Sequence, residues 1–519
     1  MAKQVITKPG FTYDDLVLHP DRIRKGLDEK GIDLRSPITS YRTKQKVELA
    51  PDELPKDTLI LNNPLTSSPM QSVTGPEMAI EVARHGGLGV IFCSQPLRDE
   101  AEMVEAVKRH KAGFVVPDVF SPESSIDDVI ERARETGYST FPVTHKGKTN
   151  GRLIGLITQN DFSERIHRGL KVHERMKPLS ELQTASYEEL GYDLRQANDV
   201  LEESHHGSLA VVDRHGRLRY MVFKKDLRAH REHPEGLVDD DKRYMVGAAV
   251  NTHDYRKRVP ALVKAGADIL FIDASQGYSD YQADALRYIK KLFPKVPVVG
   301  GNIVTEDGFD FLAENGADAV KVGMGPGSIC TTRQKFKMGR AQATAVFAID
   351  NRRQTYMKKN GIYVPIIADG GIVTNDNIAI ALALGADAIM AGRFFARFHE
   401  SPTKIAELKE ERGDQTYVAL VKPYWGEGSA RAKAWRQKRY GQSEEEEGIE
   451  GYAPYIGHVS DALPLTLRHI RLTLQKAGYR NLRDFHVKAD LEMERESTKR
   501  EGRPHDIIPS GMWADYKTS

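Results

Sequence analysis

The run Gly316-Ala-Asp-Ala-Val-Lys-Val322 joins a glycine that can end a helix to an apolar stretch of strand length. The same tripeptide recurs as Gly266-Ala-Asp268 and Gly385-Ala-Asp387, and each copy again stands directly before an apolar run. A glycine in the left-handed conformation ends a helix, so a strand can begin at once. The repeat therefore predicts successive helix-then-strand units, as in a parallel α/β sheet.

Other short apolar runs extend this rhythm over much of the chain. Near-continuous apolar runs are typical of strands that are buried on both faces of a parallel sheet. The clearest are Tyr244–Val250, Ile269–Ile272, Val296–Val299, Val364–Ala368 and Ala388–Met390, and two earlier units lie at Pro64–Met70 and Gly86–Ile91. These units suffice for a closed eight-stranded barrel, and an open doubly wound sheet is the alternative.

Size and composition narrow the class of protein. A chain of 519 residues predicts one large domain and a smaller one. Hydrophobic residues make up 40% and the formal net charge is +2, which gives no reason to expect a nucleic acid or a membrane as partner. The two cysteines favour a reducing compartment, and the N-terminus has no apolar signal core. We therefore expect a cytoplasmic protein.

The stretch 111–232 interrupts the barrel rhythm with a weak internal repeat. Thr140–Val143 leads to Leu153–Thr158 and Asp161, and later Ser208–Val212 leads to Leu218–Phe223 and Asp226. Each half reads strand, turn, strand and then a helix that begins near an aspartate. This pattern resembles a pair of CBS repeats, with an ordinary βαβ excursion as the alternative. The predicted boundaries are 1–110 for the first part of the barrel, 111–232 for the insert and 233–519 for the second part.

The segment from about 404 to 455 is polar and rich in charge and aromatic side chains. It contains Glu444-Glu-Glu-Glu447, together with Tyr424, Trp425, Trp435 and Tyr440. A long irregular segment inside a compact domain is usually a functional loop or a disordered one. We interpret it as a mobile flap.

Cys330 belongs to a glycine-rich loop, Gly323-Met-Gly-Pro-Gly-Ser-Ile-Cys330, that directly follows the predicted strand 319–322. A thiol displayed by such a loop at a strand end is placed as a nucleophile in an α/β barrel. Two later strands also end in glycine loops, Asp369-Gly-Gly371 and Gly392-Arg393. A carboxylate there can hold ribose hydroxyl groups, and the glycine N–H groups suit a phosphate. The pattern favours a nucleotide as substrate.

These motifs together resemble the family of IMP dehydrogenases and GMP reductases. The resemblance covers about residues 11–508 and is carried by the cysteine loop, the Ala368-Asp-Gly-Gly-Ile372 loop, Asn63–Met70 and the CBS-like insert, in that order. It implies a (β/α)8 TIM barrel with an inserted CBS-pair (Bateman) domain. It also implies NAD-dependent oxidation of inosine 5′-monophosphate to xanthosine 5′-monophosphate. In that reaction Cys330 attacks C2 of the purine and forms a covalent thioimidate, which water then hydrolyses.

The resemblance also assigns expected roles to the other site residues. Thr332 and Glu447 would form one proton route to the hydrolytic water, and Arg439 with Tyr440 on the flap would form another. Residues expected to bind the substrate are Ser68, Met70, Ser328, Asp369, Gly370, Gly371, Gly392, Arg393, Tyr424, Gly426, Glu427, Gly428 and Glu447. Those expected at the NAD site are Asp273, Ser275, Asn302 and Gly323.

Potassium and the quaternary structure form a further set of expectations. The family holds potassium with carbonyl groups that correspond here to Gly325, Gly327 and Cys330, and a Glu-Gly-Gly of the neighbouring subunit completes the site. This chain instead reads Glu501-Gly-Arg503, which leaves the need for potassium open. The resemblance further implies a homotetramer, and an adenine or guanine nucleotide as a possible effector of the CBS pair.

Three other functions remain open at this stage. GMP reductase shares the cysteine loop but uses NADPH and performs no hydrolysis, so the flap with Arg439 and Tyr440 favours a dehydrogenase. A non-catalytic adenine-nucleotide sensor or filament-forming protein would not need Cys330, Thr332 and Asp369. A flavin-dependent barrel oxidoreductase would stay active without the thiol.

Overall fold

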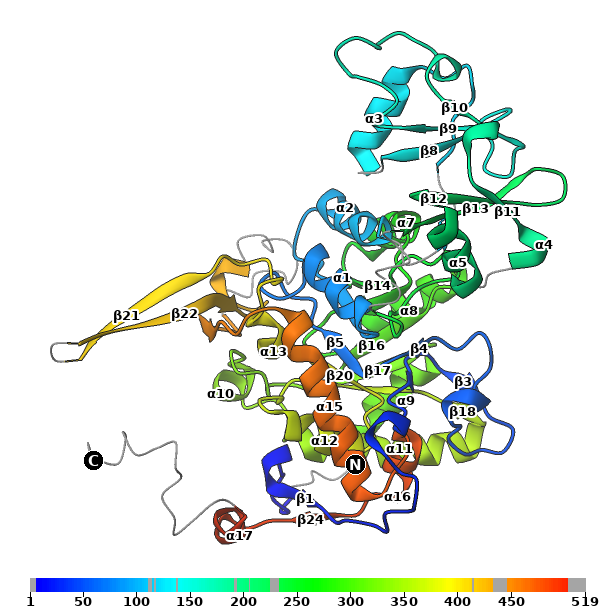
Figure 1. The fold of residues 1–519 in the computed structure, drawn as a ribbon. Coiled ribbons are helices and arrows are strands. Elements are labelled where there is room, and N and C mark those ends of the chain that lie inside the picture. The colour runs from blue at the N-terminus through cyan, green and yellow to red at the C-terminus, as the bar shows by residue number, and fades with distance from the viewer. Residues whose placement is uncertain are drawn as a thin grey trace.

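The computed structural model describes residues 6–110, 114–115, 118–136, 139–190, 194–204, 206–224, 233–412, 415–432 and 446–502. Its centre is a closed barrel of eight parallel strands (Figure 1). In order around the barrel they are β14 (Val246–Val250), β15 (Ile269–Ile272), β16 (Val298–Ile303), β17 (Ala319–Val322), β19 (Ile366–Asp369), β20 (Ala388–Ala391), β5 (Leu65–Ser67) and β6 (Leu88–Ile91). The (β/α)8 TIM barrel is confirmed, and the open-sheet alternative is wrong.

Side chains alternate along the barrel strands between two apolar layers. Leu88 and Val90 of β6, with Ile269 and Phe271 of β15, belong to one buried cluster, whereas Ile91 belongs to a larger second cluster. This period of two separates the barrel interior from the layer between strands and helices. The helices of the second layer are α1 (Pro76–Arg84), α2 (Leu97–Lys108), α7 (Tyr255–Ala265), α8 (Asp280–Leu292), α9 (Glu306–Glu314), α11 (Gln342–Asn360), α12 (Asn375–Ala383) and α15 (Val459–Ala477).

The three Gly-Ala-Asp tripeptides have a common structure at the amino ends of the strands. The glycines have φ of 96°, 94° and 100°, in the left-handed region. Each aspartate carboxylate accepts the backbone N–H of the first residue of a neighbouring strand: Asp268 that of Val246, Asp318 that of Val298 and Asp387 that of Ile366. Each carboxylate also pairs with a basic side chain, which is Lys108, Lys290 and Arg353 respectively. The repeat thus ends a helix and joins two strands.

Residues between α2 and β14 form two small sheets outside the barrel (Figure 1). One has the order β10 (Lys177–Pro178), β9 (Leu153–Thr158), β8 (Thr140–Thr144). The other has the order β11 (Thr184–Ser186), β12 (Ser208–Val212), β13 (Leu218–Phe223), β7 (Phe114–Val115). Helices α3 (Ile126–Thr136), α4 (Tyr187–Leu190) and α5 (Leu194–Ser204) accompany them. The paired strands match the predicted CBS-like halves, but the helix predicted near Asp161 is wrong, because the chain forms turns there. Asp226 lies outside the described residues, and the boundaries at 110 and 232 stay predictions.

The polar segment after residue 404 begins as a long hairpin that projects from the barrel (Figure 1). Strand β21 (Ala406–Arg412) pairs with β22 (Gln415–Trp425), which pairs in turn with β23 (Glu450–Pro454). The flap prediction therefore missed regular strand structure on both sides of residues 433–445, which lie outside the described part of the chain.

Short elements complete the barrel's surroundings. The chain ends pair through β1 (Leu16–Leu18) and β24 (Leu491–Met493), and two further pairs are β2 (Ser36–Pro37) with β4 (Ile60–Leu61) and β3 (Tyr41–Arg42) with β18 (Ile362–Tyr363). Short helices are α10 (Thr332–Phe336), α13 (Arg393–Ala396), α16 (Leu482–Lys488) and α17 (Glu496–Glu501). The 3₁₀ turns are Tyr13–Asp15, Glu29–Gly31, Pro51–Glu53, Val172–Glu174 and Leu179–Glu181. Within the described residues, every helix is too short or too polar to cross a bilayer.

Candidate active site

A cavity of about 490 Å³ opens at the carboxyl ends of the barrel strands. Its wall comes from the loops that follow β5, β15, β17, β19 and β20, from Asn302 near the end of β16, and from segments near residues 424–428 and 447–448. In parallel barrels this end of the sheet carries the active site, because each loop can place a side chain over the same opening. The lining includes Cys330, Asp369 and Tyr424.

Glycines shape the loop that carries Cys330. At Gly323, φ is 152°, and an added Cβ would lie 2.1 Å from the Asp369 carbonyl oxygen. At Gly325, φ is 82°, and an added Cβ would collide with the Arg333 side chain. Glycine at these positions therefore lets the loop leave β17 and pack against β19. The Cys330 N–H then donates to the Gly327 carbonyl oxygen at 3.1 Å, which closes the turn below a partly exposed thiol.

The Cys330 thiol leads into a short polar chain. Cys330 Sγ lies 3.3 Å from Thr332 Oγ1, and that hydroxyl lies 2.8 Å from Glu447 Oε2. Two backbone hydrogen bonds hold the same two segments together: Thr331 N donates to Glu447 O and Ile449 N donates to Ile329 O, both at 2.9 Å. Residues that are more than a hundred positions apart thus form one sulfur–hydroxyl–carboxylate line. Such a line can relay a proton beside a nucleophile.

Asp369 lies at the end of β19 and is held by two other barrel strands. Its Oδ2 accepts from Lys321 Nζ and from Asn302 Nδ2, both at 2.9 Å, and Asn302 Nδ2 also donates to Gly323 O at 2.7 Å. Lys321 is 3% exposed, so this ion pair lies in the barrel interior. Because both bonds end on Oδ2, Oδ1 can accept hydrogen bonds from a ligand.

A second polar group lies where β19 and β20 end. Gly370 and Gly371 have φ of 91° and 77°, which turns the chain sharply after Asp369. Across from them, Tyr424 is buried near Gly392 and forms hydrogen bonds with the Ser328 side chain and the Arg393 backbone. Burial raises the pKa of Tyr424, so its phenol stays protonated and can donate. With the Arg393 guanidinium, Ser68 and Met70 in the same wall, this corner suits an anion.

The segment after β22 forms the cover of the cavity. Glu427 Oε1 accepts from Gln71 N at 2.8 Å, and Trp425 Nε1 donates to Gln71 Oε1 at 3.0 Å. Gly426 and Gly428 lie against the backbone near Glu447, where an added Cβ at Gly428 would be 3.0 Å from the Glu447 Cβ. Two chain segments therefore approach closely over Cys330.

The cavity brings most of the predicted site residues together. All of those predicted for substrate, cofactor and potassium line this one cavity, as do Thr332 and Glu447. Among them, Asp273 and Ser275 come from the loop after β15, Asn302 from near the end of β16, and Gly323 from the start of the cysteine loop after β17. Arg439, Tyr440 and Arg503 lie outside the described residues.

Two residues of this site were not predicted from the sequence. Lys321 balances Asp369, and a lysine within the otherwise apolar run Ala319–Val322 was the signal that could have revealed it. Gln71 joins the cover to the loop after β5 through both its backbone and its side chain. No local pattern marks Gln71, because its partners are about 350 residues away.

A family model and two named relatives all match this chain over almost its whole length. Residues 10–505 match a family model described as "IMP dehydrogenase / GMP reductase domain". The inosine-5′-monophosphate dehydrogenase of Tritrichomonas foetus is 38% identical over 522 residues, which covers 99% of both chains. The enzyme of the same name from Aquifex aeolicus is 33% identical and covers 96% of both chains.

A solved structure is similar over nearly the whole chain. It is a crystal structure of GMP reductase from Trypanosoma brucei, a cysteine-to-alanine variant in complex with guanosine 5′-monophosphate. The TM-score is 0.76 at 25% sequence identity, and the match covers 96% of this chain and 98% of the other.

Proposed function

Since the chain belongs to the IMP dehydrogenase / GMP reductase family, we propose that it oxidises inosine 5′-monophosphate to xanthosine 5′-monophosphate with NAD. The observation that carries the proposal is the line from Cys330 through Thr332 to Glu447 inside the cavity. A reaction that ends in hydrolysis needs both a nucleophile and a group that takes a proton from water. The test is formation of NADH and xanthosine 5′-monophosphate from IMP and NAD.

The proposed chemistry balances in two stages. Cys330 loses its thiol proton, its Sγ forms a bond to C2 of the purine, and C2 loses its hydrogen as hydride. NAD, when bound, accepts that hydride. Water then attacks C2, and the carbon–sulfur bond breaks. One proton leaves the water, and Thr332 passes it to Glu447, whose Oε2 is 2.8 Å from the hydroxyl. Overall, IMP, NAD and water give xanthosine 5′-monophosphate, NADH and a proton.

The nucleotide would lie across the cavity with its sugar at Asp369. Oδ1 of Asp369 would accept from the ribose hydroxyl groups, while Lys321 and Asn302 hold Oδ2. The phosphate would occupy the corner formed by Gly371, Gly392, Arg393, Tyr424 and Ser328, where backbone N–H groups, a guanidinium and a phenol can donate. The base would then reach Cys330 and the cover at Gly426–Gly428.

The residues proposed for NAD fit a flat ring placed beside Cys330. Asp273, Ser275, Asn302 and Gly323 line the same cavity on the side of β15 to β17. Gly323 has no side chain, and the close approach of the Asp369 carbonyl leaves no room for one. A ligand can therefore come close to the backbone of the loop at this point. Asp273 would accept from the ribose hydroxyl groups of the cofactor. These residues orient the cofactor and keep water from the reacting carbon until hydride has left.

A potassium ion would be held by backbone carbonyl groups of Gly325, Gly327 and Cys330. Oxygen donors of this kind suit a hard cation. The Gly327 carbonyl already accepts from Cys330 N–H and can still use its second lone pair. The ion would keep the cysteine loop in one conformation.

GMP reductase activity is the second candidate, because the similar solved structure is a GMP reductase in complex with guanosine 5′-monophosphate. The identity of 25% to that enzyme, against 38% to the dehydrogenase of Tritrichomonas foetus, favours the dehydrogenase. An assay with GMP and NADPH separates the two: loss of NADPH would support the reductase, and no change would exclude it.

Other expectations stay predictions. They are a homotetramer, a cytoplasmic location, and an adenine or guanine nucleotide bound to the CBS pair. Mass photometry of the purified chain would test the tetramer. The proton role of Arg439 and the place of Tyr440 can be tested by substitution, with Glu447 as the alternative proton acceptor.

A further inference from the structure

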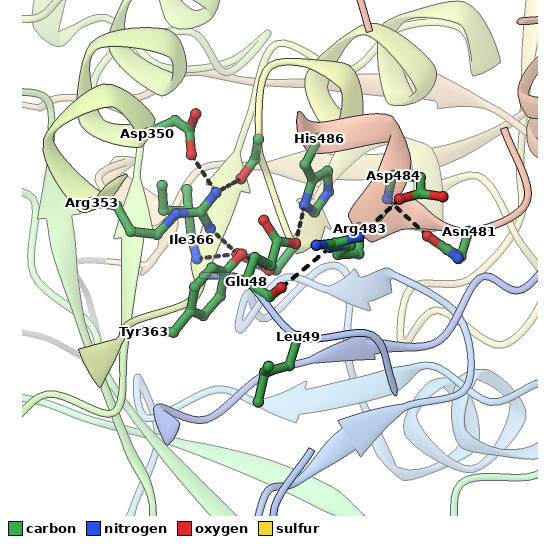
Figure 2. A network of polar contacts seen from close by, with 12 residues as sticks. Glu48, Leu49, Asp350, Arg353, Tyr363, Ile366, Asn481, Arg483, Asp484 and His486 are labelled. Atoms are coloured by element: carbon green, nitrogen blue, oxygen red, sulfur yellow. Dashed lines mark hydrogen bonds and ion pairs between the residues drawn. The ribbon is translucent and has the colours of Figure 1, made fainter. Parts of the chain in front are cut away.

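A buried polar cluster lies at the opposite end of the barrel from the active site. Its centre is Asp387, which directly precedes β20, whereas the cavity begins after the last residue of that strand. Glu48 reaches it from the loop after β3, and His486 from α16 (Figure 2). The side chains of Asp387, Glu48 and His486 are 0%, 3% and 2% exposed. Three distant parts of the chain therefore bring titratable groups together away from water.

Asp387 differs from the aspartates of the other two Gly-Ala-Asp tripeptides in its surroundings. Its Oδ2 accepts from Arg353 Nη1 at 2.5 Å and from Ile366 N at 2.7 Å, and its Oδ1 accepts from Tyr363 Oη at 2.7 Å. Asp268 and Asp318 each pair with a lysine, whereas Asp387 pairs with an arginine. Only one hydrogen bond ends on Asp387 Oδ1, so this oxygen keeps a lone pair for a ligand. Carboxylates that bind metals are usually oriented by such outer hydrogen bonds.

Glu48 and His486 supply donors of the right kind. His486 Nδ1 lies 2.9 Å from Glu48 Oε1, and one ligand atom from each of Glu48, Asp387 and His486 lies within 4.8 Å of the other two. Among the described residues, Glu48 Oε2 and His486 Nε2 are buried and have no hydrogen-bond partner. Burying such atoms unpaired is costly, so their presence points to a missing bound species.

The charges of the cluster point to a cation. Glu48, Asp387 and Asp350 bring three carboxylates, and Arg353 brings one guanidinium, which bonds both aspartates and the Gly385 carbonyl. The other nearby guanidinium, Arg483, donates to the Glu48 backbone and pairs with Asp484. Three carboxylates against one guanidinium therefore leave an excess of negative charge among these groups, which a bound cation would balance.

We propose that Glu48, Asp387 and His486 form a binding site for a divalent transition metal of the zinc type. One imidazole and two carboxylates are ligands that zinc accepts, and the ligand atoms of these three side chains already lie within 4.8 Å of one another. The ion would join the loop after β3 and helix α16 to the base of β20. Its role would be to fix two segments that are far apart in the sequence, the loop at Glu48 and helix α16, to the end of the barrel opposite the active site.

The test measures zinc in the full-length protein. The thiol of Cys330 can bind zinc as well, so every protein carries the Cys330→Ser change. After chelation, incubation with zinc chloride and gel filtration, mass spectrometry of the elements should find about one zinc per chain. Glu48→Gln and His486→Gln should each lose most of that zinc. His469→Gln is the matched control, because His469 pairs with Asp376 at 3.0 Å on the exposed face of α15 and should keep it.

A second readout keeps the proposal testable if a variant folds poorly. Zinc should raise the unfolding temperature of the Cys330→Ser protein, because it binds the folded state. The effect should be absent from Glu48→Gln and present in His469→Gln. The proposal is overturned if the parent protein retains no zinc after gel filtration, or if Glu48→Gln and His486→Gln retain as much as the parent.

Discussion

Thr332 Oγ1 lies 2.8 Å from Glu447 Oε2, so the first residue of α10 contacts the segment that leads into β23. Thr332 is also 3.3 Å from Cys330 Sγ. Within the proposed reaction, this places a proton acceptor one hydroxyl away from the sulfur that holds the substrate. The separation of roles between Cys330 and Glu447 leads to different kinetic signatures for the two residues.

Glu447→Gln should slow hydrolysis and leave hydride transfer largely intact. Glutamine keeps the shape of the side chain but cannot take a proton, and a positioned base contributes roughly 100-fold or more. Rapid mixing with IMP and NAD should show a burst of NADH and then a steady rate about 100-fold lower. Glu446→Gln is the matched control and should behave as the parent. A variant that loses the burst would place Glu447 in an earlier step.

Lys321→Met should weaken nucleotide binding, because it leaves the half-buried Asp369 without its main positive partner. Breaking such a buried pair costs about 3–5 kcal/mol. We expect the KM for IMP to rise by about 10-fold or more, with Lys321→Arg restoring part of it. The control is Lys290→Met, which removes the pair to Asp318 at the other end of the barrel and should reduce stability alone. Equal KM values in both variants would contradict the role of Lys321.

The barrel itself could be predicted from the chain, for a physical reason. A strand buried on both faces must be almost wholly apolar, so Ile269–Ile272 and Ala388–Met390 stand out without knowledge of their neighbours. The Gly-Ala-Asp repeat marks where helices end and strands begin. The cysteine loop was also recognisable, since its glycines are required by local backbone geometry.

The contacts between distant segments could not be predicted in this way. Lys321 with Asp369, and Glu48 with His486, depend on which strands and loops become neighbours after folding. The β21–β22 hairpin was predicted as irregular because its sequence is polar, yet cross-strand pairing overrides that local preference. Arg439 and Tyr440 lie outside the described residues, so their predicted roles stay predictions.

Gly392→Ala should disturb the phosphate corner. An added Cβ would lie 2.8 Å from the Tyr424 hydroxyl oxygen and 3.1 Å from the Met70 sulfur, so Tyr424 would have to move. We expect the KM for IMP to rise about 10-fold with less change in the KM for NAD. Gly451→Ala is the control, because nothing lies within 4 Å of its added Cβ. An unchanged KM for IMP would remove Tyr424 from the phosphate site.

The pair of His486 and Glu48 should make the metal-free protein less stable at higher pH. Burial alone would lower the pKa of His486, but the Glu48 charge and hydrogen bond prevail and raise it above 6.5. A raised pKa adds stability below about pH 6.5, and this is lost as the pH rises through the folded-state value. Urea unfolding with chelator should show this loss in the parent and not in His486→Gln. Identical pH dependence in both proteins would contradict the pairing.

The central claim is that Cys330 becomes bonded to the purine during turnover. Acid quenching of the protein with IMP and NAD, followed by peptide mass spectrometry, should find the nucleotide attached to Cys330, most strongly in Glu447→Gln. Absence of added mass at Cys330 in both proteins, while NADH is still produced, would contradict the account.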